Sequence, residues 1–156
     1  MTMTFAPATP DRLAAVDALI RAAFTPYVRA LGREIAPGSY DWFADAIVKG
    51  DIFVAHDCHD LVGAITTKRG DRDLSLEQIG VAPARQKQGI ASWMIGQIES
   101  VARGRGCRTL SLNTAEMMED RVRLYTRHGF RIVRRGPPEH GRDAHVRVYM
   151  VKEFAR

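Results

Sequence analysis

The apolar positions of this chain change their period along the sequence, and each change predicts a different kind of element. In the first part they recur every three or four residues, which is typical of a helix with one buried face. Four residues mark that face: Leu13, Val16, Ile20 and Phe24. Thr9 or Asp11 can cap this helix, and Pro26 is expected to stop it because proline has no backbone N–H to donate.

A second helix is predicted to begin at Ser39 or Asp41, either of which can cap it, and to run through Val48 to Gly50. Beyond Gly50, short apolar runs bounded by polar turns predict strands, and two stretches return to helical spacing. The strands are expected at residues 3–6, 52–56, 61–68, 74–81, 109–113, 130–135 and 144–151, and the later helices at 90–103 and 117–128. This order predicts a single α/β domain over residues 1–156, with a mixed, mostly antiparallel central sheet flanked by helices.

The composition is that of a globular domain, because 46% of the 156 residues are hydrophobic. No apolar run approaches the roughly 20 residues of a membrane-spanning helix, and the first residues lack the pattern of a signal peptide. We therefore expect a cytoplasmic protein with no membrane partner. Cys58 and Cys107 are far apart, and neither they nor the five histidines have metal-ligand spacing, so we expect reduced thiols and no bound metal.

The charge of the chain is distributed unevenly between its two parts. Residues 1–60 carry a net charge of −3 and residues 61–156 a net charge of +8. A basic half suits a polyanionic ligand. Nucleic acid is the rival interpretation, but the arginines are spread over several elements without a recognition helix or an aromatic-rich basic strand, so no nucleic-acid partner is expected. A solvated basic face is the plain alternative for most of these arginines.

The turn at residues 86–91 lies between a predicted strand and a predicted helix, and its residues suit a phosphate group. The start of a helix presents unpaired backbone N–H groups and the positive end of the helix dipole. Gly89 and Ala91 let a diphosphate approach the backbone closely, while Arg85 and Lys87 add positive charge. The pattern Gln-x-x-Gly-x-Ala is neither the dinucleotide fingerprint nor the P-loop motif.

This motif resembles the one that N-acetyltransferases of the GNAT superfamily carry after their fourth strand, where it grips the pyrophosphate of acetyl-CoA. A second match is Leu124-Tyr125-Thr126-Arg127-His128-Gly129-Phe130, which is similar to the family's Leu-Tyr-x-x-x-Gly-Phe segment. The resemblance covers residues 61–152 well and the first 60 residues only in outline. It implies the GNAT fold, in which the fourth and fifth strands splay apart, and acetyl-CoA as a co-substrate in the gap.

The resemblance also assigns the residues that would bind acetyl-CoA. They are the turn residues Gln86, Lys87, Gln88, Gly89, Ile90 and Ala91, together with Ile79, Val81, Asn113 and Tyr125. Ile79 and Val81 would act through their main chain, which in the family pairs with the pantetheine arm and polarises the acetyl carbonyl. Many members carry an asparagine early in the following helix that contacts the cofactor. That position is Met118 here, so Asn113 or Thr114 is left to substitute, unless Asn113 is simply a turn residue at a strand end.

Transfer of an acyl group from a thioester to an amine needs a base for the amine and an acid for the leaving thiolate. The resemblance places Tyr125 as the acid, and the alternative is a tyrosine packed into the core from an amphipathic helix. Glu77 is the candidate base, because related enzymes often carry a glutamate on the strand before the turn. The alternative is an exposed strand glutamate. A bulge near Ile79-Gly80 would change the sheet face that Glu77 occupies.

The function expected from these residues is transfer of an acetyl group to a primary amine by direct attack, without a covalent enzyme intermediate. The acceptor would be a small molecule or a peptide. In such folds the first two helices, here about residues 9–49, wall the acceptor site, and the acidity of this part of the chain favours a cationic amine. A non-catalytic acyl-CoA-binding module and a nucleic-acid-binding domain stay open as alternatives, and the sequence leaves a homodimer open as well.

Overall fold

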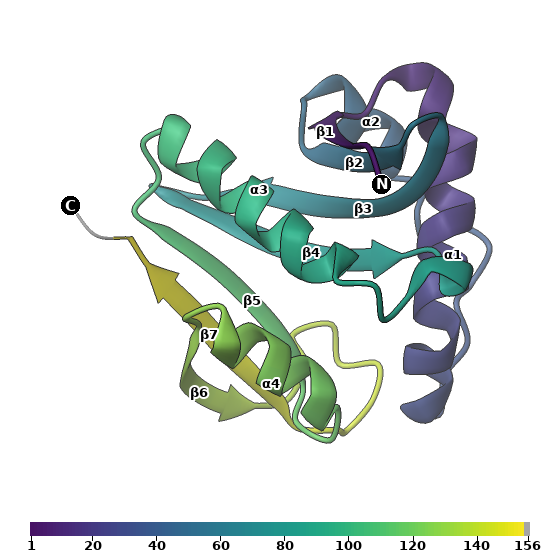
Figure 1. Cartoon of the computed structure of the whole chain (residues 1–156). Coiled ribbons are helices and arrows are strands. Elements are labelled where there is room, and N and C mark those ends of the chain that lie inside the picture. Colours follow the sequence, from purple (N-terminus) through teal and green to yellow (C-terminus); the bar gives the residue numbers. More distant parts are fainter. Residues whose placement is uncertain (155–156) are drawn as a thin grey trace.

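The computed structural model describes residues 1–154, which form one seven-stranded sheet with helices packed on it (Figure 1). The strands are β1 (Met3–Pro7), β2 (Ile52–Asp57), β3 (Asp60–Arg69), β4 (Asp73–Val81), β5 (Thr109–Ala115), β6 (Arg131–Gly136) and β7 (Arg147–Glu153). The helices are α1 (Leu13–Ala30), α2 (Phe43–Val48), α3 (Ile90–Gly104) and α4 (Glu119–Arg127), with 3₁₀ turns at Pro10–Arg12 and Pro83–Arg85. The strand order is β1-β2-β3-β4-β5-β7-β6, and within the described residues β4 and β5 are the one parallel pair. The predicted mixed, mostly antiparallel α/β sheet is therefore confirmed.

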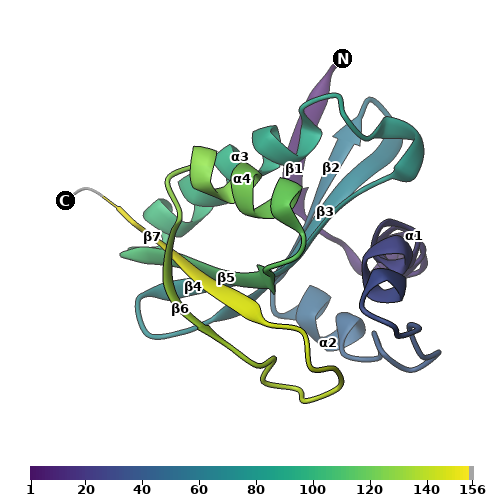
Figure 2. The ribbon, with the colours of Figure 1, turned by 90° about the horizontal axis from the view of Figure 1, so that it is seen from below.

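Different helices cover the two faces of the sheet (Figure 2). α1 and α2 pack on one face, where Ile20 and Phe43 are completely buried. α3 and α4 lie on the opposite face, where Met94 and Ile98 of α3 are completely buried. Each such side chain contributes roughly 1.5–3 kcal/mol of transfer free energy. The apolar residues whose spacing predicted the helices are thus the same residues that pack the helices against the sheet.

β4 and β5 pair over three residues and then diverge, as Figure 1 shows. The paired segments are Asp73 to Ser75 and Thr109 to Ser111. The carboxylate of Asp73 accepts hydrogen bonds from the hydroxyl groups of Thr109 and Ser111, both at 2.7 Å. These hydrogen bonds hold β4 and β5 together at the end where the two strands pair. The splay of the fourth and fifth strands is confirmed, and Asp73 is a part of it that the sequence did not indicate.

The prediction that Pro26 stops the first helix is wrong, since α1 continues to Ala30. Pro26 removes the backbone donor for the carbonyl of Ala22. Both residues are exposed, so water can bond that carbonyl instead. On the two sides of the proline, the rings of Phe24 and Tyr27 pack edge to face with their centroids 5.8 Å apart, and this contact helps to hold the end of the helix.

The second helix is shorter than predicted, because α2 begins at Phe43. Residues 37–42 form successive turns closed by hydrogen bonds between residues three apart. No side-chain cap stands at the start of α2, so Ser39 and Asp41 do not have the capping role expected of them. The other elements match their expected ranges to within three residues. None of the helices in residues 1–154 is long and apolar enough to span a membrane.

Candidate active site

Two cavities meet where β4 and β5 diverge, and Tyr125 lies between them. The turn cavity, of about 390 Å³, lies against the end of β4, the turn into α3, and α4. The arginine cavity, of about 260 Å³, lies between α1, the middle of β4, the end of β5 and the β6–β7 loop. The two share three lining residues: Ile79, Arg121 and Tyr125. A group bound in one cavity can therefore reach a group bound in the other beside Tyr125.

The turn cavity is built on the left-handed turn that precedes α3. Lys87 and Gly89 have φ angles of 64° and 81°, and Trp93 donates a backbone hydrogen bond to the Gly89 carbonyl at 3.0 Å to begin the helical ladder. The N–H groups of residues 90–92 precede that bond, so they are available to an anion at the helix start. A Cβ atom on Gly89 would meet open space. The backbone conformation therefore favours glycine at this position, and the missing side chain leaves room in the cavity.

Side chains around the turn hold it in place. Gln86 donates from Nε2 to the Val81 carbonyl at 3.2 Å, which ties the turn back to the end of β4. Arg85 donates to the carboxylate of Asp57 at 2.6 Å and to Gln88 Oε1 at 3.3 Å. Gln88 thus contacts Arg85 and does not line the turn cavity, which differs from the place expected for it.

Most of the residues expected to bind the cofactor do come together. Those that line the turn cavity are Ile79, Val81, Gln86, Lys87, Gly89, Ile90, Ala91 and Tyr125. Asn113 does not, because β5 has diverged from β4 at that point and carries Asn113 into the arginine cavity. Among residues 1–154, no group of three His, Cys, Asp or Glu side chains could hold a metal ion.

Tyr125 is 5% exposed, and its ring packs edge-on against Phe130 with the centroids 6.0 Å apart. Burial raises the pKa of the Tyr125 hydroxyl above its ordinary value, although the nearby Arg121 guanidinium acts to lower it. A phenol with a raised pKa keeps its proton at neutral pH and can donate it. Tyr125 therefore packs in the core and also lines both cavities, and its role as the acid stays a prediction.

Glu77 lines the arginine cavity and lies at a β-bulge, two residues earlier than the bulge considered from the sequence. Two neighbouring residues of β3 pair with Leu76 and Gln78, so Glu77 between them is the extra residue of β4. The bulge lets Leu76 and Ile79 both pack in the core beside α3, and all four residues from Leu76 to Ile79 line the arginine cavity. Glu77 is exposed and accepts a hydrogen bond from the Ser75 hydroxyl at 3.0 Å.

The acidic residues of the first 60 positions do not gather around either cavity, so the acidic wall expected for the acceptor site is not found at these two cavities. Four of them pair with cations and line neither cavity: Asp17 with Arg21, Asp45 with Lys49, Asp51 with Arg69 and Asp57 with Arg85. Of the acids before residue 61, Glu34 alone lines either cavity in the described structure, and it is paired with Arg29. The net negative charge of residues 1–60 therefore does not describe the charge of the two cavities.

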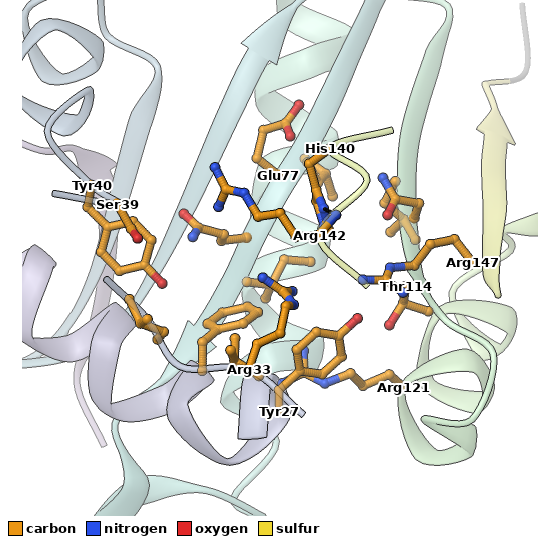
Figure 3. A pocket seen from close by; sticks show the side chains of 18 of the residues that line it. Tyr27, Arg33, Ser39, Tyr40, Glu77, Thr114, Arg121, His140, Arg142 and Arg147 are labelled. Atoms are coloured by element: carbon orange, nitrogen blue, oxygen red, sulfur yellow. Dashed lines mark hydrogen bonds between the residues drawn. The ribbon is translucent and has the colours of Figure 1, made fainter. Parts of the chain in front are cut away.

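Four arginines line the arginine cavity instead: Arg33, Arg121, Arg142 and Arg147. Figure 3 shows Arg33 and Arg142 in the middle of the cavity, between Tyr40 on one side and Arg147 on the other. Sequence reasoning missed these residues because they come from separate segments with no motif in common. Arg121 alone had a local signal, since it lies one helical turn before Tyr125 on α4.

Comparisons with known proteins agree with this fold. A family model described as the acetyltransferase (GNAT) family matches residues 14–130, while no curated protein sequence matches the chain. The PaiA N-acetyltransferase of Thermoplasma acidophilum, in complex with coenzyme A, has a TM-score of 0.78 at 15% identity, with 99% of this chain and 100% of that chain covered. The ribosomal-protein alanine N-acetyltransferase of Escherichia coli has a TM-score of 0.79 at 18% identity, with 99% and 96% covered. A GNAT acetyltransferase of Elizabethkingia anophelis, with acetyl-CoA bound, has a TM-score of 0.74 at 18% identity, with 98% and 99% covered.

Proposed function

The chain belongs to the GNAT family of acetyltransferases, and we propose that it transfers the acetyl group of acetyl-CoA to the primary amine of a small-molecule or peptide acceptor. One observation carries this proposal: the turn cavity and the arginine cavity meet at Tyr125, so a thioester in the first and an amine in the second can come into contact. Two of the similar structures contain coenzyme A or acetyl-CoA, which supports acetyl-CoA as the donor.

Acetyl-CoA would lie along the splay with its diphosphate on the turn at residues 86–91. The backbone N–H groups at the start of α3 are donors suited to phosphate oxygens, and Lys87 adds a positive charge beside them. The main chain of Ile79 and Val81, at the end of β4, would pair with the pantetheine arm. Both residues line the turn cavity, so an arm held there would bring the thioester to Tyr125.

The reaction would be a direct attack, without a covalent enzyme intermediate. Glu77 takes a proton from the acceptor ammonium, directly or through water, and the freed amine nitrogen attacks the thioester carbonyl carbon. The C–N bond forms, the C–S bond breaks, and Tyr125 gives its proton to the departing sulfur. The amide nitrogen then loses the second proton, which restores the tyrosine, and Glu77 releases its proton to solvent. The products are the N-acetylated acceptor and coenzyme A.

The test is a thiol-release assay with acetyl-CoA and a panel of amines, run beside calorimetric binding of acetyl-CoA. Turnover of at least one amine supports the proposal, and the Tyr125→Phe variant should bind acetyl-CoA but turn it over slowly. Binding of acetyl-CoA without turnover of any amine would instead identify a non-catalytic acyl-CoA-binding module. Absence of acetyl-CoA binding would overturn the donor assignment.

A further inference from the structure

The arginine cavity is cationic, although its expected occupant is an amine. The guanidinium groups that line it belong to Arg33, Arg121, Arg142 and Arg147, and the carboxylates that line it belong to Glu34 and Glu77. Glu34 is already paired with Arg29 at 3.0 Å. The cavity therefore carries an excess of positive charge, and an amine alone cannot balance it.

One carboxylate, Asp143, serves two of these arginines and holds them in place. Arg147 is buried and donates from both terminal nitrogens to Asp143, each at 3.0 Å. Arg33 donates from Nε to the same carboxylate at 2.9 Å. The hydrogen bonds from Arg147, together with the charges of Arg147 and Arg33, hold the pKa of Asp143 well below its usual value. One negative charge thus faces two positive charges, and Arg33 uses Nε for this contact while its side chain lines the cavity.

Arg142 and Arg121 have no carboxylate within ion-pair distance among residues 1–154. The Arg121 guanidinium lies over the rings of Phe24 and Tyr27, 5.0 Å and 4.8 Å from their centroids. These contacts hold the guanidinium group of this α4 residue against α1. Arg142 comes from the loop between β6 and β7 and extends into the cavity beside Arg33 (Figure 3). Arg142 is therefore an exposed positive charge of the cavity, unpaired among the described residues, and Arg33 beside it shares the single carboxylate of Asp143 with Arg147.

The arginine cavity is also lined by a neutral hydrogen-bond donor, His140. Its Nδ1 accepts the backbone N–H of Arg142 at 2.9 Å, so Nε2 carries the proton of the neutral ring. Burial, with Arg33 and Arg147 adding to it, lowers the pKa of His140. The ring is consequently neutral at pH 7, and it can donate a hydrogen bond without adding charge.

We propose that the acceptor carries an anionic group, a carboxylate or a phosphonate-type oxyanion, beside its amine, and that Arg33 and Arg142 bind this group. The inference rests on the proposed function, because it names the acceptor of the same site. Guanidinium groups match the geometry of carboxylate and phosphate oxygens better than any other side chain. The cavity of about 260 Å³ is slightly smaller than typical ligand pockets, which span roughly 300–1,000 Å³. An amino acid or an aminoalkylphosphonate fits it better than a long peptide.

The same charges favour the reactive form of the amine. Nearby positive charge disfavours an ammonium group and lowers its pKa, so more of the bound acceptor is the free amine that attacks. A polyamine would bring additional cations into the cavity and no anion to the arginines. The cavity therefore selects against polyamines as well as for anionic amines.

The experiment compares kcat/KM for matched amines in the thiol-release assay at saturating acetyl-CoA. The panel contains amino acids, the amides of the same amino acids, aminoalkylphosphonates of equal length, and spermidine. The anionic amines should exceed the neutral amides by about 10-fold or more, the effect expected of a charge-assisted hydrogen bond. Whichever class has the higher kcat/KM, the amino acids or the aminoalkylphosphonates, identifies the anionic group that the cavity prefers. Equal or faster turnover of amides or spermidine overturns the inference and leaves the proposed function standing.

The Arg142→Gln variant tests the assignment to a residue. The preference for an amino acid over its amide should fall about 10-fold or more, mainly through KM. The control, Arg131→Gln, removes an exposed arginine of β6 that pairs with Glu153, and its preference should equal that of the parent. A preference that survives in Arg142→Gln overturns the assignment.

A binding measurement separates this inference from the proposed function. The protein saturated with coenzyme A is titrated in a calorimeter with the same amino acids and amides. If no amine is acetylated, the proposed function fails, yet tighter binding of amino acids than of their amides, lost in Arg142→Gln, still supports an anionic subsite. Equal binding of the two classes overturns the inference whether or not acetyl transfer occurs.

Discussion

The hydroxyl of Tyr27 accepts a hydrogen bond from the backbone N–H of Ala115 at 3.0 Å, which ties the last part of α1 to the end of β5. At Ala115, β5 is well beyond the three residues that it pairs with β4. Because β4 no longer lies beside β5 at this point, the N–H of Ala115 has no carbonyl of β4 to bond, and the Tyr27 hydroxyl accepts the hydrogen bond instead. Because Tyr27 also lines the arginine cavity, the bond closes one side of it.

Tyr27→Phe should weaken both the fold and the cavity. Ala115 is completely buried, so its N–H would be left without an acceptor at a cost of about 1–3 kcal/mol in the free energy of unfolding. The ring would keep its contact with Phe24. Urea unfolding should show the lower stability, and the KM for the acceptor should rise while acetyl-CoA affinity stays near that of the parent. An unchanged free energy of unfolding would mean that another group takes over the N–H.

Gly89→Glu should abolish acetyl-CoA binding without unfolding the protein. The added carboxylate would stand where the diphosphate is proposed to sit, and like charges repel strongly at such a short distance. The φ angle of 81° at Gly89 also strains any other residue, by about 1–2 kcal/mol. Calorimetric binding of acetyl-CoA, with circular dichroism to check folding, measures the effect.

A matched variant separates the loss of the phosphate site from backbone strain. Gly106 has a φ of 78°, and a Cβ atom there would also meet open space. It follows α3 at the end opposite Gly89 and lines neither cavity. Gly106→Glu should therefore bind acetyl-CoA normally. Loss of binding in both variants would point to strain, and normal binding by folded Gly89→Glu would place the diphosphate elsewhere.

The turn at residues 86–91 and the buried faces of the helices could be predicted from the sequence because their signals are local. The turn depends on a small residue at a fixed position in its motif, and each buried helix face depends on apolar residues at a fixed spacing. Pro26 shows the limit of a local rule. Its effect depends on whether the carbonyl of Ala22 reaches water, and only the folded arrangement decides that.

The arginine cavity could not be predicted in the same way. Arg33 and Asp143 are 110 residues apart in the chain and 2.9 Å apart in the structure, and no spacing rule connects them. The net charge of the first 60 residues does not describe the charge of this cavity. Carboxylates paired on other surfaces count in that sum but not in the cavity, because a site depends on where each side chain lies.

Tyr125→Phe should lower kcat by about 10-fold or more, as loss of a general acid usually does, with little change in acetyl-CoA affinity. The ring keeps its packing against Phe130, so thermal stability should change little. Burial raises the pKa of Tyr125, so its acid form persists as the pH rises. The kcat of the parent should therefore not fall from loss of this acid until the pH exceeds about 10, the ordinary tyrosine value. A pH profile of kcat tests this, and an unchanged kcat in the variant would assign Tyr125 to packing alone.

Glu77→Gln should lower kcat/KM at neutral pH by about 100-fold or more if Glu77 is the general base. Glutamine keeps the shape of the side chain and can still accept the hydrogen bond from Ser75, but it cannot take a proton. The bulge at this position should be unaffected, so the variant should fold normally. The thiol-release assay with the best acceptor of the panel measures the loss.

The pH dependence of that loss shows whether it reflects proton transfer. Above the pKa of the acceptor amine, most of the acceptor is already deprotonated and needs no base, so Glu77→Gln should approach the parent there. Glu34→Gln removes the same charge from the same cavity, and any effect that the two variants share is electrostatic. The three proteins are compared from neutral pH to about pH 10, where an ordinary aliphatic ammonium titrates. If Glu34→Gln loses as much activity, or if the deficit of Glu77→Gln persists at alkaline pH, Glu77 is not the base, and the acceptor must lose its proton to solvent.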